Sequence, residues 1–120
     1  MNFKPAIPML RIFDEAKAKE FYVDYLGFQV DWEHRHTAEL PLYLQVSRGD
    51  CLLHLSEHHG DGTPGTKLRI ECDDVQAYHE GLRAKEYQYF NPHLGKQPWA
   101  KWELRLTDPF GNELIFYQAQ

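Results

Sequence analysis

Residues 14–28, DEAKAKEFYVDYLGF, contain the start, the buried face and the end of one helix. Asp14 is a typical N-cap, because its carboxylate can accept hydrogen bonds from the free amide groups of the first turn. Gly27 suits the position just after a helix, where the backbone often adopts positive φ. Between them, residues 17–26 carry an apolar stripe at helical spacing, formed by Ala18, Phe21, Tyr22 and Tyr25.

The same signals recur 60 residues later. Asp74 is a second candidate N-cap, and it precedes the helical pattern VQAYHEGLRAKEY. The apolar positions aligned in that pattern are Val75, Tyr78 and Leu82. Turn glycines also repeat, at Gly49 and Gly111. Because 60 residues is half of the 120-residue chain, the pattern indicates an internal duplication.

Strand patterns surround the first helix. Residues 6–12, AIPMLRI, predict a strand, and Pro5 and Pro8 restrict it to a strand start or an edge. The alternation in FQVDWEHR predicts a strand with one face made of Phe28, Val30 and Trp32. Two apolar runs, 40–47 and 51–56, flank Arg48-Gly49-Asp50 and predict a hairpin, because Gly supplies the positive φ of a tight turn.

The second half follows the same order. TKLRIEC predicts a strand that places Leu68, Ile70 and Cys72 on one face. Residues 87–100, YQYFNPHLGKQPWA, are expected to be irregular. KWELRLTDP and ELIFYQ predict two further strands, and the breakers of Asp108-Pro109-Phe110-Gly111-Asn112 predict the turn between them.

The predicted fold class is therefore α+β, with two βαβββ modules that form curved mixed sheets. The expected bounds are 5–58 for the first module, 59–65 for a linker and 66–119 for the second module, within a single domain, 1–120. One module alone has too few elements to bury its sheet. We therefore expect the modules to pack in pairs, either directly or by exchange between the chains of a homodimer.

Composition excludes some classes of partner. The net charge of −5 argues against nucleic acid, whose phosphates require a basic surface. No apolar run approaches the ~18 residues of a membrane span, and no signal-peptide pattern is present at the N-terminus. The two cysteines, Cys51 and Cys72, lie in apolar runs, as expected of buried thiols in a reducing compartment. We expect a cytoplasmic protein.

The string His54-Leu55-Ser56-Glu57-His58 matches the inverted zinc-protease signature H-x-x-E-H. That site needs both histidines on one face of a helix. Here the first histidine lies in a run of strand length, and the second precedes a linker rich in glycine. On a strand, histidines four residues apart lie roughly 13 Å from each other. We therefore expect no protease site.

Nearly all of the chain resembles the vicinal oxygen chelate superfamily, also called the glyoxalase/bleomycin-resistance superfamily. The resemblance lies in four stretches: AIPMLRIFDEAKAKEFYVDYLGFQVDWE, VSRGDCLLHL, RIECDDVQAYHEGLRAKEY and LTDPFGNELIFYQ. It implies paired βαβββ modules that each curl into a half-barrel around a cleft, usually within a dimer. Catalytic members of the superfamily are expected to hold a metal through His, Gln or Glu at matched points on inward-facing strands.

The positions that match those ligands are poor in metal-binding side chains. The resemblance places them at Ile7, at His54, near Thr66 or Lys67, and at Ile115. Only His54 could bind a metal, whereas a catalytic divalent ion needs about three protein ligands. We expect neither a metal nor a cofactor.

This departure resembles the bleomycin-resistance branch, which binds its drug without chemistry. Pro5 and Pro8 match paired prolines in an arm that subunits of that branch exchange, and Trp99 matches a tryptophan in the wall of the drug groove. The resemblance implies non-catalytic binding of a small aromatic or cationic molecule such as bleomycin. Ligand contacts are expected from Trp99, Trp102, His54, Tyr43, Trp32 and Phe116, with Asp31, Glu33 and Glu103 as possible sources of negative potential.

Two other functions remain open. The chain could be a metal-dependent enzyme of glyoxalase or dioxygenase type with relocated ligands, using His54 together with loop or partner-chain residues. It could also be a structural or regulatory dimer with a vestigial cleft. Each candidate residue could also have a purely structural role. The aromatic residues could pack in the core or at an interface, and His54 could be a neutral, hydrogen-bonded histidine in a cavity.

Overall fold

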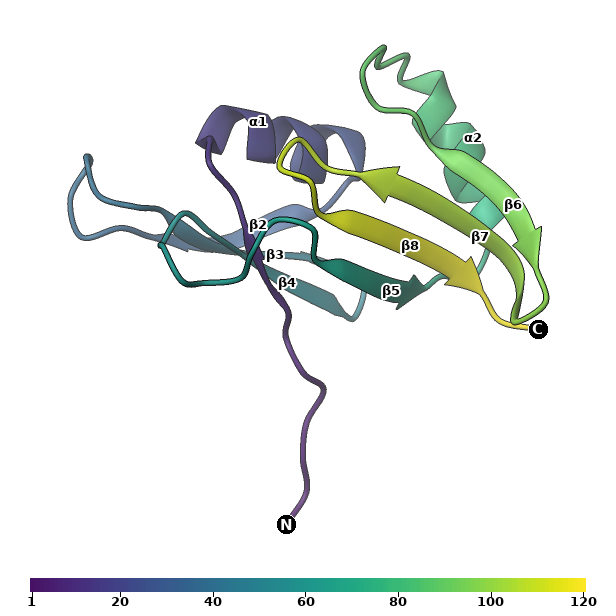
Figure 1. Ribbon diagram of the computed structural model, residues 1–120, viewed down its shortest axis with the longest axis horizontal. Helices are drawn as coiled ribbons and strands as arrows, with labels where there is room; N and C mark the ends of the chain where they lie inside the picture. The colour runs from purple at the N-terminus through teal and green to yellow at the C-terminus, as the bar shows by residue number, and fades with distance from the viewer. The chain divides into compact units, whose positions relative to one another are not determined.

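The computed structural model describes residues 1–120 and divides the chain into two compact units, Met1–Thr63 and Pro64–Gln120. Each unit contains strand, helix and three further strands in that order, and its four strands form one sheet. Figure 1 shows the two units, each with its helix against one side of its sheet. The predicted α+β architecture of two βαβββ modules is confirmed.

The first sheet has the order β1-β4-β3-β2. Its strands are β1 (Met9–Arg11), β2 (Gln29–His34), β3 (Tyr43–Arg48) and β4 (Cys51–Ser56). Strand β1 is parallel to β4, and the other neighbours are antiparallel. The β3–β4 hairpin closes through two residues, with Gly49 at φ 57°. A two-residue turn needs positive φ there, so the predicted hairpin is confirmed.

The first helix starts as predicted but ends in an unexpected form. Asp14 accepts a hydrogen bond from the Lys17 amide at 2.9 Å, at the start of α1 (Glu15–Lys19). The helix then widens into a π-helical segment, η1 (Glu20–Tyr25), where the Leu26 amide bonds to the Phe21 carbonyl at 2.9 Å. Hydrogen bonds over five residues define this wider turn, which is rare in proteins. The buried side chains of this helix are Ala18, Phe21, Tyr22, Tyr25 and Leu26.

The second sheet has the order β5-β8-β7-β6. Its elements are β5 (Lys67–Glu71), α2 (Val75–Ala84), β6 (His93–Gln97), β7 (Ala100–Thr107) and β8 (Glu113–Gln118). Asp74 caps α2 by accepting from the Ala77 amide at 3.0 Å. The helix packs on β7 and β8, where the Tyr78 ring meets the Phe116 ring edge-on at 5.1 Å.

A buried carboxylate shapes the turn between β7 and β8. Asp108 accepts hydrogen bonds at 2.8 Å from the amides of Phe110 and Asn112, and also from the Asn112 side chain. Gly111 completes the turn at φ 90°. The predicted turn is confirmed, and its aspartate closes it with bonds that backbone groups alone would not supply.

Two expectations about strands are corrected. The segment 87–100 was expected to be irregular, but residues 93–97 form β6, which pairs His93 with Arg105 and Leu94 with Leu104 of β7. Strand β1 is shorter than the predicted 6–12, because Pro8 just before it has no amide proton to donate. The β6 difference arises from pairing with β7, which a local pattern does not reveal.

Residues 1–7 form an exposed arm that runs away from the first sheet (Figure 1). Met1 and Phe3 are almost fully accessible to solvent. None of the helices has the length and apolar character that crossing a membrane requires.

Candidate functional site

The side of the first sheet opposite α1 carries the strongest candidate site, and we call it the first open face. Its central row crosses all four strands through Met9, His54, Gln45 and Trp32. Alternate residues of β3 and β4, such as Leu44, Val46, Leu53 and Leu55, are buried toward the helix. The alternation of side chains along a strand therefore separates this face from the core.

A β-bulge in β2 decides which way Trp32 points. Val30 pairs with Val46, but Trp32 pairs with Gln45, so Asp31 is the extra residue of the bulged strand. An extra residue shifts the alternation and re-aims the side chains that follow it. The expectation that Phe28, Val30 and Trp32 share one face is therefore wrong: Trp32 lies on the first open face.

Three aromatic rings meet on this face. The rings of Trp32 and Tyr43 stack with centroids 5.9 Å apart and planes 11° from parallel. His54 meets both edge-on, at 5.3 Å from Trp32 and 5.2 Å from Tyr43. Trp32 is 42% exposed, so a flat molecule could stack on the group from the solvent side.

Both ring nitrogens of His54 are occupied by hydrogen bonds. Nδ1 lies 2.7 Å from the Tyr43 hydroxyl, and Nε2 lies 3.0 Å from Oε1 of Gln45. Burial lowers the pKa of His54 below its ordinary value. The imidazole is therefore neutral at pH 7, donating through one nitrogen and accepting through the other.

Asp31 is the charged group at the edge of this face. It accepts from Gln45 Nε2 at 3.0 Å, from the Ser47 hydroxyl at 2.9 Å and from Gln29 Nε2 at 3.2 Å. The bonds from Gln45 and Ser47 lower the pKa of Asp31, because they favour the ionised form. The carboxylate expected to supply negative potential is thus tied into the hydrogen-bond network of the sheet.

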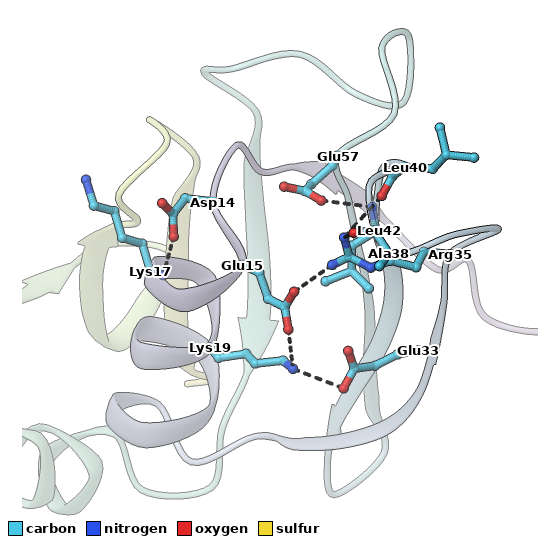
Figure 2. Close-up of polar contacts among 10 residues, drawn as sticks. All are labelled: Asp14, Glu15, Lys17, Lys19, Glu33, Arg35, Ala38, Leu40, Leu42 and Glu57. Atoms are coloured by element: carbon cyan, nitrogen blue, oxygen red, sulfur yellow. Dashed lines mark hydrogen bonds and ion pairs between the residues drawn. The ribbon is translucent and has the colours of Figure 1, made fainter.

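An ion-pair network holds β2 and the following loop against α1, as Figure 2 shows. Lys19 bridges Glu15 at 2.8 Å and Glu33 at 3.0 Å, and Arg35 contacts Glu15 at 2.6 Å. Arg35 also donates to the carbonyls of Ala38 and Leu40 inside the loop. Glu33 follows Trp32, and this loop precedes Tyr43, so the network holds the chain on either side of the stacked pair.

The residues of the string H-x-x-E-H have separate structural roles. His54 lies in β4, whereas Glu57 accepts the Leu42 amide at 2.8 Å and closes the base of the β2–β3 loop (Figure 2). His58 lies beyond the strand, with its ring 6.3 Å from that of Tyr43. His54 thus lies on a strand and not on a helix, as its sequence context predicted.

The matching face of the second sheet, which we call the second open face, is charged. Glu103 is 1% exposed and accepts from Arg69 at 2.7 Å, from Arg105 at 3.2 Å and from the Trp99 indole. Burial by itself would raise the pKa of Glu103, but the hydrogen bonds from Arg69 and Trp99 outweigh it and the pKa is lowered. Two arginines compensate this carboxylate, so the expected negative potential at Glu103 is neutralised locally.

Two predicted ligand contacts lie on the other side of the second sheet. Phe116 is 4% exposed and packs against Tyr78 of α2. Trp102 pairs with Gln118, whose side chain bonds to the first amide of α2. Trp102 is therefore on the helix-covered side as well, where Lys96 lies 5.1 Å from its ring centre. Trp99 is 59% exposed and lies on the turn between β6 and β7.

A polar hollow of about 410 Å³ lies in the second unit. Its lining includes Tyr89, Asn91, His93 and Arg105. None of the six aromatic and histidine contacts predicted from the sequence lines it.

The donor set does not fit the metal that catalytic relatives hold. Ile7 and Ile115 have no ligand atoms, and His54 uses both ring nitrogens within the first open face. No group of three or more His, Cys, Asp or Glu side chains in the structure is arranged to hold a metal ion.

The chain belongs to the glyoxalase superfamily, because the model of the family described as "Glyoxalase superfamily protein" matches residues 1–120. A comparison with curated proteins found no match. Within the superfamily the chain lies near the bleomycin-resistance branch, as a solved relative with 32% identity indicates.

Among solved structures, the chain is similar to the bleomycin-binding protein of bleomycin-producing Streptomyces verticillus in complex with copper(II)-bleomycin. Identity is 32%, the TM-score is 0.75, and 100% of this chain and 99% of that chain are covered. The antibiotic-binding protein TnmS3 of Streptomyces sp. CB03234 has 23% identity and a TM-score of 0.73, with both chains covered completely. A bleomycin resistance determinant of transposon Tn5 has 22% identity, a TM-score of 0.78 and coverage of 98% and 99%.

Gln45 and the bonds of Asp31 were not predicted. Gln45 could have been found, because the hairpin closing at Arg48 and Cys51 fixes a register that places Gln45 opposite His54. The role of Asp31 depends on the bulge, and no periodicity in the sequence reveals it.

Proposed function

We propose that this protein binds and sequesters a small aromatic or cationic molecule of the bleomycin type without transforming it. The observation that carries the proposal is the accessible stack of Trp32 on Tyr43 beside a neutral His54. Binding sites for such molecules combine aromatic surface with a few placed polar groups. The first open face offers both.

The similarity to the Streptomyces verticillus protein supports the choice of ligand. That relative is described in complex with copper(II)-bleomycin, and it aligns with this chain over almost the full length of both. A fold alone does not establish a function, so the proposal rests on the similarity together with the aromatic face.

The chemistry of the face supports binding without catalysis. His54 is held by two hydrogen bonds and is neutral, and its neighbours on the central row are Met9 and Gln45. Neither of these side chains is a nucleophile or a general base at pH 7. The residues that contact the ligand in this proposal are Trp32, Tyr43 and His54 of the first open face.

Tryptophan fluorescence during titration with copper-free bleomycin tests the proposal, since the copper ion would quench emission by itself. We expect a saturable change at one site per chain. After binding, mass spectrometry of the recovered drug should show an unchanged mass. Unchanged emission at every drug concentration would refute drug binding, and an altered drug mass would refute sequestration without chemistry.

We also propose that the chain acts as a homodimer in which residues 1–7 pack on a second copy. The arm exposes Met1, Phe3 and Ile7, and its prolines Pro5 and Pro8 favour an extended form that can reach another chain. Light scattering should give twice the chain mass of 14.2 kDa. Replacing Phe3 and Ile7 with Ser should weaken the dimer, and a monomeric parent protein would contradict the idea.

A further inference from the structure

A chain of hydrogen bonds crosses three strands of the first open face. It runs from Asp31 of β2 to Gln45 of β3, on to His54 of β4 and back to Tyr43 of β3. We call it the Asp31 relay. Each link is 2.7 to 3.0 Å long, within the range of ordinary hydrogen bonds.

The direction of the relay is set at its charged end. An ionised carboxylate can only accept hydrogen bonds, so the Gln45 atom that faces Asp31 must be the amide nitrogen. The Gln45 oxygen is then the atom that faces His54. Because an amide oxygen can only accept, His54 must carry a proton on Nε2.

The direction of the last hydrogen bond, between His54 and Tyr43, follows from the charge of the imidazole. A neutral ring that is protonated on Nε2 has a lone pair on Nδ1. Tyr43 must therefore donate its only hydroxyl proton to Nδ1, across the 2.7 Å contact. Burial raises the pKa of Tyr43 and lowers that of His54, so both groups stay in these forms at neutral pH.

We propose that Asp31 acts through this relay as a positioning residue, leaving the Tyr43 oxygen as a pure acceptor beside the aromatic stack. The face then selects flat molecules that carry an N–H or ammonium donor near the ring. This inference rests on the proposed binding function and names the ligand class within it: donor-bearing heteroaromatic molecules rather than acceptor-only ones of the same shape.

The relay can be reversed by one substitution. In Asp31→Asn, the oxygen of the new side chain keeps the bonds from Gln29 and Ser47, and its NH₂ group replaces the acceptor that faces Gln45. Gln45 is then expected to turn its oxygen toward that NH₂ group and its nitrogen toward His54. His54 would shift its proton to Nδ1 and donate to the Tyr43 oxygen, which frees the hydroxyl proton to donate outward.

The tautomer of His54 is measured directly by long-range proton–nitrogen NMR on ¹⁵N-labelled protein without ligand. We expect protonation on Nε2 in the parent protein and on Nδ1 in Asp31→Asn. Ser47→Ala is the matched control, because it removes a bond to Asp31 outside the relay and should leave the tautomer unchanged. An Nδ1–H tautomer in the parent protein, or an unchanged tautomer in Asp31→Asn, overturns the relay.

The selectivity is measured with two probes of one shape, 2-aminobenzothiazole and 2-methoxybenzothiazole, by NMR titration. The parent protein should prefer the amino probe by about threefold to tenfold, the effect of one hydrogen bond. Asp31→Asn and Tyr43→Phe should lose this preference. Equal binding of the two probes by the parent protein overturns the selectivity.

The two measurements separate the inference from the proposed function. If bleomycin binds but neither probe shifts the Tyr43 signals, the ligand lies elsewhere and the selectivity is wrong. If nothing binds, the proposed function fails together with the ligand class. The tautomer result stands on the relay alone in either case.

Discussion

The two sheets carry matching rows of residues with opposite chemistry. The row in the first unit is Met9, His54, Gln45 and Trp32, and the equivalent row in the second is Arg69, Ile115, Arg105 and His93. Met9 and Arg69 each lie five residues before the N-cap of their unit, which establishes the equivalence. A neutral histidine with hydrogen-bond partners thus corresponds to an isoleucine between two arginines.

This contrast shows that two units with the same backbone pattern can carry surfaces of different chemistry. The backbone pattern of caps, hairpin and sheet order is shared, because it depends on a few turn and cap residues. The side chains of the open faces are not constrained by the core and have diverged. The first unit offers aromatic stacking and directed hydrogen bonds, whereas the second holds a buried carboxylate under two arginines.

The largest expected effect concerns that carboxylate. Glu103→Ala removes the common acceptor of Arg69, Arg105 and Trp99 and leaves both arginines without the carboxylate that they share. Both arginines are partly exposed, which moderates the loss to about 2 kcal/mol of unfolding free energy. Urea denaturation measures it. Gln45→Ala, at the first row, should cost less, and the reverse order would contradict the contrast between the faces.

The second prediction asks which face supplies the aromatic contact. Trp32→Ala should weaken bleomycin binding about tenfold, or ~1.4 kcal/mol, consistent with the loss of one stacked ring. Trp99→Phe keeps an aromatic ring and should change affinity less. Trp102→Phe is the control, because its ring lies on the helix-covered side. Calorimetry measures all three, and a larger loss for Trp99→Phe would move the main contact to the second unit.

The third prediction tests the aspartate N-cap that the helices of both units share. Asp14→Ala and Asp74→Ala each remove one N-cap bond and should each lower stability by about 1 kcal/mol. Asn at either position retains the acceptor and should restore most of the loss. Thermal denaturation gives the comparison. Strongly unequal losses would show that the two helix starts are not equivalent in energy.

The smallest expected effect is a pH dependence from His54. Its pKa is lowered in the folded state, so the unfolded chain binds more protons as the pH falls through the ordinary value near 6.5. The contribution of His54 to the free energy of unfolding is therefore fully present above that pH and decreases below it. His54→Gln should remove this part of the decrease in denaturation curves measured between pH 7 and 5. Identical curves for the parent and the variant would leave no role for His54 in the titration.

Part of the candidate site could be predicted from the sequence. The hairpin turn at Gly49 places Gln45 opposite His54. The resemblance to the superfamily singled out His54, whereas Trp32 and Tyr43 were candidates because they are aromatic. Phe116 and Trp102 were chosen by type, but strand alternation puts them with the residues that pack toward α2. Trp99 was placed by the resemblance, and its bond to Glu103 connects it to the second open face.

The sequence by itself determined the duplication, the two N-caps, the β3–β4 hairpin and the family, because these depend on residues close together in the chain or on a motif in a fixed order. Only the tertiary structure decided the bulge at Asp31, the π-helical turn and the pairing of β6. A strand with an extra residue looks locally like one without it, and only the neighbouring strand determines where the alternation shifts. That shift turns Trp32 toward His54 and brings Asp31 within reach of Gln45.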